Sequence, residues 1–242
     1  MSMKLVVIGG VAGGATAAAR ARRISEDAHI ILFERGEFIS FANCGLPYYI
    51  GGVIPERGRL LVAGIETFRQ RYRIDVRTLS EVLSIDRAAK TVTVMNHADG
   101  QTYAEAYDRL ILSPGAAPIR PPLPGLDHDR VFTLRTIPDA DRIKAAIETM
   151  RSASAVVVGG GFIGLEMAES LTARGIRTTV LEKLPQLLPP FDADMAALVQ
   201  AHLGDKGVDL RLGQGLSGVR EQDRRLKVAT DSGAEIVCDL LI

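Results

Sequence analysis

The chain has 242 residues, which is enough for one large domain or two small ones. Lys and Arg total 29, as do Asp and Glu, so the zero formal charge gives no electrostatic reason to expect a nucleic acid or an anionic membrane as partner. Two cysteines exclude a disulfide-stapled secreted scaffold, and no apolar run reaches the roughly 18 residues that a membrane span requires.

The first expected unit is a strand, a glycine-rich turn, a helix and a second strand. The apolar run 4–8 predicts a buried strand that leads into the turn 9–14, and a helix over 15–24 follows. A second apolar strand, 29–33, ends at Glu34. This order is typical of dinucleotide binding, in which glycines let the backbone approach a pyrophosphate and the acidic residue bonds a ribose hydroxyl. Val11 stands where the usual motif has its second glycine, so this fingerprint is incomplete.

Cys44 is the candidate catalytic residue, ten positions after Glu34 in the segment 40–52. Pro47 is well placed to begin a helix, and a thiol near a helix N-terminus ionises more easily and becomes a better nucleophile. The alternative is a small buried apolar residue, which the polar, glycine-rich surroundings argue against. Dithiol flavoenzymes carry a second cysteine a few residues away, where this chain has Tyr48 and Tyr49. Disulfide chemistry at Cys44 would therefore need a sulfur brought by the substrate.

The middle of the chain predicts a hairpin, a closing strand and a connector. Residues 84–86 and 91–94 are expected to pair around 87–90, and an apolar strand begins after Asp108 and closes at Gly115. Four prolines between 118 and 124 predict a stiff, extended connector. We therefore expect a first domain over 1–117, a connector over 118–126 and a second domain over 127–242.

The second domain repeats the pattern of the first. A strand over 155–158 leads into Gly159, Gly161 and Gly164, a helix over 165–174 follows, and a strand over 178–181 ends at Glu182. The Glu182 carboxylate would repel a 2′-phosphate and favours NADH, although the adjacent lysine keeps NADPH open. A second hairpin is expected over 219–229. The sequence stops inside the expected strand 237–242, so we expect a longer polypeptide.

These patterns predict an α/β fold with two Rossmann-like, three-layer dinucleotide-binding domains that carry β-meander insertions. Two dinucleotide sites in one chain indicate a relay between cofactors. A flavin beside a nicotinamide is the usual chemical pairing, because a flavin can pass two electrons on to sulfur. Cys238 lies in an expected strand and is interpreted as a small buried apolar residue.

The segments 9–23, 40–52, 107–116 and 156–169 resemble the pyridine nucleotide-disulfide oxidoreductases. Within that family the chain is most similar to the single-cysteine branch of coenzyme A-disulfide reductases and NADH-dependent persulfide reductases. The resemblance implies FAD in the first domain, NAD(P)H in the second, and reduction by the flavin of a mixed disulfide on Cys44. It also implies that Phe162 swings aside when the nicotinamide docks.

The motifs and the resemblance together assign the site residues. The expected cofactor contacts in the first domain are Gly9, Gly10, Val11, Ala12, Gly13, Gly14, Glu34, Arg35 and Gly115. Those in the second domain are Gly159, Gly161, Phe162, Ile163, Gly164, Glu166 and Glu182. The expected substrate contacts are Thr16, Arg20, Arg23, Ser40, Asn43 and Arg71. No metal site is expected.

Helical geometry separately places Thr16, Arg20 and Arg23 on one face, because they are spaced i, i+4 and i+7. Two guanidiniums on that face could hold the phosphates of an anionic carrier, and a solvated basic face is the alternative. Arg71 belongs to a second basic run, 69–73, for which the same two interpretations stay open.

The sequence therefore predicts an FAD-dependent NAD(P)H:disulfide oxidoreductase that reduces coenzyme A disulfide or a coenzyme A persulfide or polysulfide through Cys44. One alternative is an NADH oxidase or peroxidase in which Cys44 cycles through a sulfenate, and another is a non-enzymatic nucleotide-binding redox sensor. Glycines interrupt the apolar start of the chain and arginines follow it, so we expect a cytoplasmic protein. The resemblance implies that the full-length protein is a homodimer.

Overall fold

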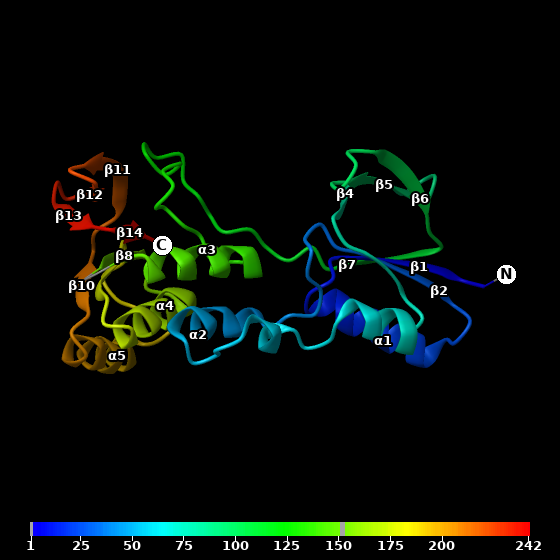
Figure 1. The fold of residues 1–242 in the computed structure, drawn as a ribbon, viewed down its shortest axis with the longest axis horizontal. Helices are drawn as coiled ribbons and strands as arrows, with labels where there is room; N and C mark the ends of the chain where they lie inside the picture. Colours follow the sequence, from blue (N-terminus) through cyan, green and yellow to red (C-terminus); the bar gives the residue numbers. More distant parts are fainter. Residues whose placement is uncertain (1, 151–152) are drawn as a thin grey trace. The chain divides into compact units, whose positions relative to one another are not determined.

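The computed structural model describes residues 2–150 and 153–242, which form two compact units. The first unit comprises the chain up to Ala42 together with Arg57–Ala116, and the second comprises Asn43–Glu56 together with the chain from Ala117 onward. Both units are seen in Figure 1. The second unit thus contains a short segment that interrupts the first unit in the sequence.

The first unit is built on a parallel sheet of four strands in the order β3-β2-β1-β7. Its strands are β1 (Lys4–Ile8), β2 (His29–Phe33), β3 (Asp75–Arg77) and β7 (Arg109–Leu112). In the register of the sheet, Val6 pairs with Ile31 on one side and with Leu110 on the other. The strands over 4–8 and 29–33 and the strand before Gly115 are therefore confirmed.

Two further layers cover this sheet. Helix α1 (Gly13–Ile24) and a π-helical turn (Thr67–Arg71) pack on one face, where Val7 and Leu32 are buried. The other face buries Val6 and Ile31 against a meander of β4 (Ser80–Asp86), β5 (Thr91–Asn96) and β6 (Thr102–Ala106). Burial on both faces explains why the strands are continuous apolar runs. Helix α1 begins two residues earlier than expected, inside the glycine turn.

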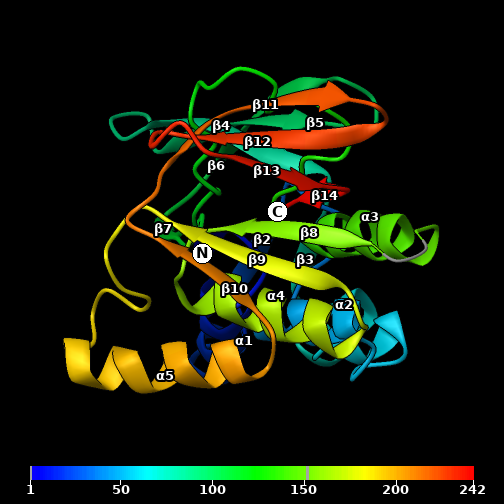
Figure 2. The same ribbon diagram turned by 90° about the vertical axis from the view of Figure 1, so that its left-hand side faces the viewer.

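The second unit repeats the architecture, as Figure 2 shows. Its parallel sheet has the order β10-β9-β8-β14, and a meander lies on one side of it with α4 and α5 on the other. The helices are α3 (Ile137–Glu148), α4 (Phe162–Ala173) and α5 (Ala193–Asp205). The strands are β8 (Ser154–Val158), β9 (Arg177–Glu182), β10 (Asp209–Leu212), β11 (Leu216–Gln222), β12 (Arg225–Thr230), β13 (Glu235–Cys238) and β14 (Leu240–Leu241). The predicted fold class and the hairpin over 219–229 are confirmed.

The expected single strand over 237–242 is wrong, because the chain changes sheets at Asp239. Cys238 ends β13 of the meander, whereas β14 joins the parallel sheet. The Asp239 carboxylate accepts hydrogen bonds from the amide and hydroxyl of Ser154 at 2.8 and 2.9 Å and lies 3.1 Å from Nε of Arg225. Burial alone would raise the pKa of Asp239, but these bonds outweigh it and lower the pKa. An ionised aspartate thus fixes the point of the switch.

Arg22 is a buried cation in the first unit. Its guanidinium donates to the carbonyls of Tyr72 (2.7 Å), Glu26 (2.6 Å), Arg73 (2.9 Å) and Ser25 (3.1 Å). Its side chain comes from the last turn of α1, where unpaired helix carbonyls favour a cation. Burial and the nearby Arg73 lower the pKa of Arg22. The side chain therefore ties the end of α1 to the loop before β3.

The Arg22→Met variant is expected to lower the free energy of unfolding by about 3 kcal/mol, because four carbonyls lose charged donors. Arg23→Met is the matched control, since Arg23 is the next residue but is exposed. Its expected cost is within about 0.5 kcal/mol. Urea unfolding measures both values, and equal losses in the two variants would contradict the assignment.

Candidate functional site

Each unit carries a glycine turn at the carboxyl end of its first parallel strand. The amide of Gly9 donates to the carbonyl of Phe33 at 2.8 Å, and the amide of Gly159 donates to the carbonyl of Leu181 at 2.9 Å. Gly9 and Gly159 have φ values of +93° and +108°, a conformation that favours glycine. In open parallel sheets, ligands bind at these carboxyl ends.

The last glycine of each turn lets the helix lie against the strand. A Cβ atom at Gly14 would lie 1.7 Å from the carbonyl oxygen of Gly9, and one at Gly164 would lie 2.0 Å from that of Gly159. Within the described ranges, no side chain caps α1 or α4, and neither first turn contains a carboxylate. A Cβ atom at Gly161 would meet open space. Uncapped amides beside an open backbone fit a pyrophosphate.

The acidic residues Glu34 and Glu182 brace the two turns in the same way. One oxygen of Glu34 accepts from the amide of Gly10 at 2.8 Å, and one oxygen of Glu182 accepts from the amide of Gly160 at 2.6 Å. In each case the second oxygen accepts from an amide two residues further along the chain, at 2.9 and 2.7 Å. A carboxylate has about four lone-pair positions, so each retains acceptors for a ribose hydroxyl.

The internal repeat extends beyond the two acids. The amide of Ser40 donates to the carbonyl of Gly10, and the amide of Leu188 donates to the carbonyl of Gly160, both at 2.9 Å. Ser40 and Leu188 also share the same φ of 48°. After these points the units diverge: the first continues into the segment with Cys44, and the second into α5.

Some of the first-unit candidates line a small hollow at the carboxyl ends of β1 and β2. The hollow has a volume of about 110 Å³, and Gly9, Glu34, Arg35 and Pro114 help to line it. The next residue, Gly115, has a φ of +71° and is exposed. Val11 is half-buried, and the following residues Ala12 and Gly13 are exposed at the start of α1. Three of the predicted cofactor residues, Gly9, Glu34 and Arg35, therefore line one hollow.

In the second unit, exposed apolar side chains stand at the start of α4. Phe162 and Ile163 are 60% and 57% exposed, although large apolar residues of a folded core are normally buried. The Phe162 ring contacts the ring of Phe191, with centroids 6.1 Å apart. Glu166, one turn further along α4, is half-buried. An uncovered ring beside the turn offers a surface for a planar group.

Cys44 lies in a short 3-10 turn (Asn43–Gly45) directly before helix α2 (Leu46–Gly51), which has Pro47 in its first turn. The thiol is exposed, whereas Cys238 is 1% exposed. Burial, and after it the charge of Asp239, raise the pKa of Cys238 to about 12. Cys238 therefore stays protonated at neutral pH, and Cys44 is the exposed thiol of the two.

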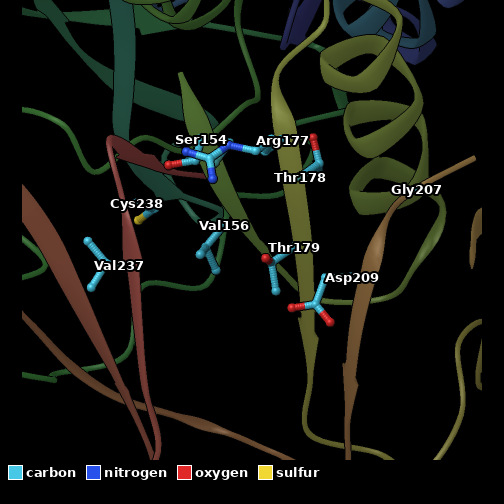
Figure 3. A pocket seen from close by; sticks show the side chains of 10 residues that line it. Ser154, Val156, Arg177, Thr178, Thr179, Gly207, Asp209, Val237 and Cys238 are labelled. Carbon is cyan, nitrogen blue, oxygen red and sulfur yellow. The ribbon is translucent and has the colours of Figure 1, made fainter. Parts of the chain in front are cut away.

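A second hollow, of about 260 Å³, lies at the opposite end of the second sheet (Figure 3). It is lined by Ser154, Arg177 and Asp209, at the amino ends of β8, β9 and β10, and by Val237 and Cys238 of β13. The glycine turn follows the carboxyl end of β8, so this hollow is distinct from the nucleotide position. Its thiol is the unreactive one.

The expected substrate contacts are distributed over both units. Thr16, Arg20 and Arg23 are all exposed on α1, as their spacing predicts. Arg71 is exposed in the π-helical turn, with its guanidinium 5.7 Å from the centroid of the Tyr72 ring. Ser40 belongs to the first unit and Asn43 to the second, and both are half-buried.

Three residues that support the turns, α1 and α2 are not predicted from the sequence. Gly160 is not part of the spaced glycine motif, yet its amide donates to Glu182. Arg22 carries no signal that separates it from its exposed neighbour Arg23. Tyr49 stands out in the sequence only for not being a cysteine, but its hydroxyl bonds Asp141 of α3. Such pairings link residues far apart in the sequence.

In the part of the chain that the structure describes, none of the helices has the length and apolar character needed to cross a bilayer.

Known proteins are similar to this chain over nearly its whole length. Coenzyme A disulfide reductase of Staphylococcus haemolyticus is 37% identical over 239 residues, which are 99% of this chain and 53% of that protein. The crystal structure of reduced Bacillus anthracis CoADR-RHD has a TM-score of 0.95 and 51% identity, and the match covers 100% of this chain and 43% of that one. The NAD-dependent persulfide reductase from A. fulgidus has a TM-score of 0.93 and 36% identity, over 99% of this chain and 45% of that one.

The chain thus spans about half the length of these relatives. Residues 3–242 match the family described as pyridine nucleotide-disulphide oxidoreductase. This match covers nearly the whole sequence and includes both glycine turns and Cys44, so it confirms the predicted resemblance. The chain is a member of the pyridine nucleotide-disulphide oxidoreductase family.

Proposed function

We propose that this chain acts in an FAD-dependent oxidoreductase that uses NAD(P)H to reduce coenzyme A disulfide, or a coenzyme A persulfide or polysulfide, with Cys44 as its single redox-active cysteine. The observation that carries the proposal is one exposed thiol in a chain with two braced glycine turns. The names of the relatives, coenzyme A disulfide reductase and NAD-dependent persulfide reductase, support the same substrate class.

The two turns would hold the two cofactors. Around the first turn, the glycines from Gly9 to Gly14 would receive the FAD pyrophosphate, and Glu34 and Arg35 would face its ribose end. Around the second turn, Gly159, Gly161 and Gly164 would receive the pyrophosphate of NAD(P)H, with Glu182 at the ribose. Phe162, Ile163 and Glu166 would lie beside the nicotinamide end. When bound, the nicotinamide and the flavin supply the two electrons that disulfide reduction requires.

Cys44 would carry the sulfur chemistry. Its thiolate attacks one sulfur of the substrate disulfide, so that a mixed disulfide forms and one coenzyme A thiolate leaves. Two electrons and protons then return Cys44 and the second coenzyme A to their thiol forms. Overall, the disulfide, NADH and one proton give two thiols and NAD⁺. The buried, protonated thiol of Cys238 takes no part.

The arginines of the first unit would hold the carrier. Arg20 and Arg23 present two exposed guanidiniums on the same face of α1 as Thr16. Guanidiniums match the geometry and charge of phosphate groups, of which coenzyme A carries several. Ser40 and Asn43 are proposed as further contacts on the resemblance alone, and Arg71 on its place in the basic run 69–73. The homodimer and the cytoplasmic location stay predictions from the sequence.

NADH is the proposed hydride source, and NADPH the weaker one. The Glu182 carboxylate is held in place by two amides, at 2.6 and 2.7 Å, so it cannot turn away from a 2′-phosphate without breaking both bonds. Lys183 follows it and is exposed. Its ammonium group can offset part of the repulsion, which leaves NADPH as a slower substrate.

The test is anaerobic NADH oxidation by the full-length protein with coenzyme A disulfide and with coenzyme A persulfide. We expect a flavin absorbance spectrum and two thiols released for each NADH consumed on the disulfide. Glutathione disulfide serves as a control disulfide without phosphates and should react slowly. NADH oxidation that depends on oxygen or peroxide but not on the disulfide would identify an oxidase or peroxidase instead. Absence of the flavin spectrum would identify a redox sensor.

A further inference from the structure

The segment 43–52, which contains Cys44 and is called the thiol segment below, is packed on α3 and α4 of the second unit. Figures 1 and 2 both show α2 beside α4. The guanidinium of Arg174 donates to the carbonyl of Ile50 at 2.9 Å. A Cβ atom at Gly51 would lie 3.0 Å from the side chain of Ser170, so the two helices approach closely at this point. The thiol segment is therefore carried by the nicotinamide-binding unit.

Tyr49 contacts α3 through both its hydroxyl and its ring. Its hydroxyl donates to the Asp141 carboxylate at 2.9 Å, and the Lys144 ammonium lies 4.0 Å from the centroid of its ring. Asp141 and Lys144 are three residues apart on α3, so one helix face holds both the edge and the face of the ring. Tyr49 is 7% exposed, whereas Asp141 and Lys144 are half-buried, so the contact lies at the edge of the packed surface.

Helix α2, which forms most of the segment, is too short to be stable without the surface on which it packs. Helix α2 has only six residues, and helices shorter than about 12 residues are not stable alone in water. Its conformation therefore depends on the surface below it, where Leu46 and Ile50 are buried. The neighbouring Tyr48 lies within the influence of α4, because the charge of Glu166, burial and the charge of Glu169 raise its pKa. Cys44 itself stays exposed at the free end.

We infer that Tyr49 is a positioning residue for Cys44: its contact with Asp141 and Lys144 fixes the thiol segment on α3, so that the sulfur is presented in one place. This inference rests on the proposed function of Cys44 as the redox-active thiol. It assigns a role in disulfide reduction to a residue that acts through its contact with α3.

The test compares Tyr49→Phe, which keeps the ring above Lys144 but removes the hydroxyl, with Tyr103→Phe. Tyr103 is a matched control, because its hydroxyl also contacts a charged group, Arg77 at 3.2 Å, but lies in the first unit. Three quantities are measured on the full-length protein: amide hydrogen exchange of residues 43–52, kcat for coenzyme A disulfide, and NADH-dependent ferricyanide reduction. Ferricyanide accepts electrons without a thiol.

For Tyr49→Phe we expect roughly tenfold faster exchange within 43–52 and a roughly tenfold lower kcat with the disulfide, which corresponds to about 1.4 kcal/mol, the value of one hydrogen bond. Ferricyanide reduction and the KM for NADH should stay unchanged. Asp141→Ala should reproduce this pattern from the other partner, and Tyr103→Phe should change none of the three quantities.

The inference is overturned if exchange within 43–52 is unchanged in both variants, or if ferricyanide reduction falls in parallel with disulfide reduction. The second result would mean that the tyrosine supports the fold and not the thiol. If the wild-type protein fails to reduce the disulfide, the proposed function is lost, but exchange and the alkylation rate of Cys44 still decide whether Tyr49 fixes the segment. Cys238 is the internal standard for alkylation, because its thiol is buried.

Discussion

The Cys44→Ser variant of the full-length protein is expected to reduce coenzyme A disulfide roughly a thousandfold more slowly than the wild type, or not at all. A serine hydroxyl is hardly ionised at neutral pH, and it cannot form the mixed disulfide on which the proposed reaction depends. Cofactor binding should persist, because neither glycine turn contains Cys44. NADH-dependent ferricyanide reduction should therefore continue at the wild-type rate.

Cys238→Ala is the matched control for this loss. Its thiol is buried with a pKa near 12, so its removal should leave disulfide turnover within about twofold of the wild type and affect only stability. Steady-state assays with the disulfide and with ferricyanide measure both effects. Normal disulfide turnover in the Cys44→Ser protein would end the proposal that this sulfur is redox-active.

The Gly164→Ala variant is expected to weaken NADH binding by about tenfold or more and to cost about 3 kcal/mol of stability. Its Cβ atom would lie 2.0 Å from the carbonyl oxygen of Gly159, and both groups belong to the backbone. Helix α4 must therefore move away from β8. That movement shifts the amides at the helix start that would bind the pyrophosphate.

Gly204→Ala tests whether this effect belongs to the turn. Gly204 lies in α5, and a Cβ atom there would meet no atom within 4 Å, so alanine should stabilise that helix by about 0.5–1 kcal/mol. Fluorescence titration with NADH and urea unfolding compare the two proteins. Equal NADH affinity in both variants would show that the close approach at Gly164 does not position the amides.

Most of the strands, helices and turns are predictable from local sequence patterns. The glycine turns are predictable because each combines an apolar strand, spaced glycines and a terminal acid. The spacing also identifies Gly14, whose position close to the backbone of Gly9 leaves no room for a side chain. The start of α1 was misplaced by two residues because Gly13, a poor helix former, is its first residue. The strand break at Asp239 was missed because both halves are equally apolar.

Contacts between distant residues could not be predicted. Tyr49 and Asp141 are 92 positions apart, and Arg22 meets carbonyls 50 and 51 positions away. No periodicity or motif links such partners, because only the folded topology brings them together. The same limit applies to the thiol segment, whose sequence follows the first nucleotide motif although its side chains pack in the second unit.

That arrangement has a consequence for any attempt to dissect the chain. A recombinant piece beginning at Ala117 would lack residues 43–56 and would present to water the apolar patch that Leu46 and Ile50 normally shield. The complementary piece would contain α2 without the α3 and α4 surface on which it packs. A cut at the proline-rich connector alone removes residues 43–56 from the second unit. To study the two units separately, these residues should therefore be returned to the second unit as a synthetic peptide.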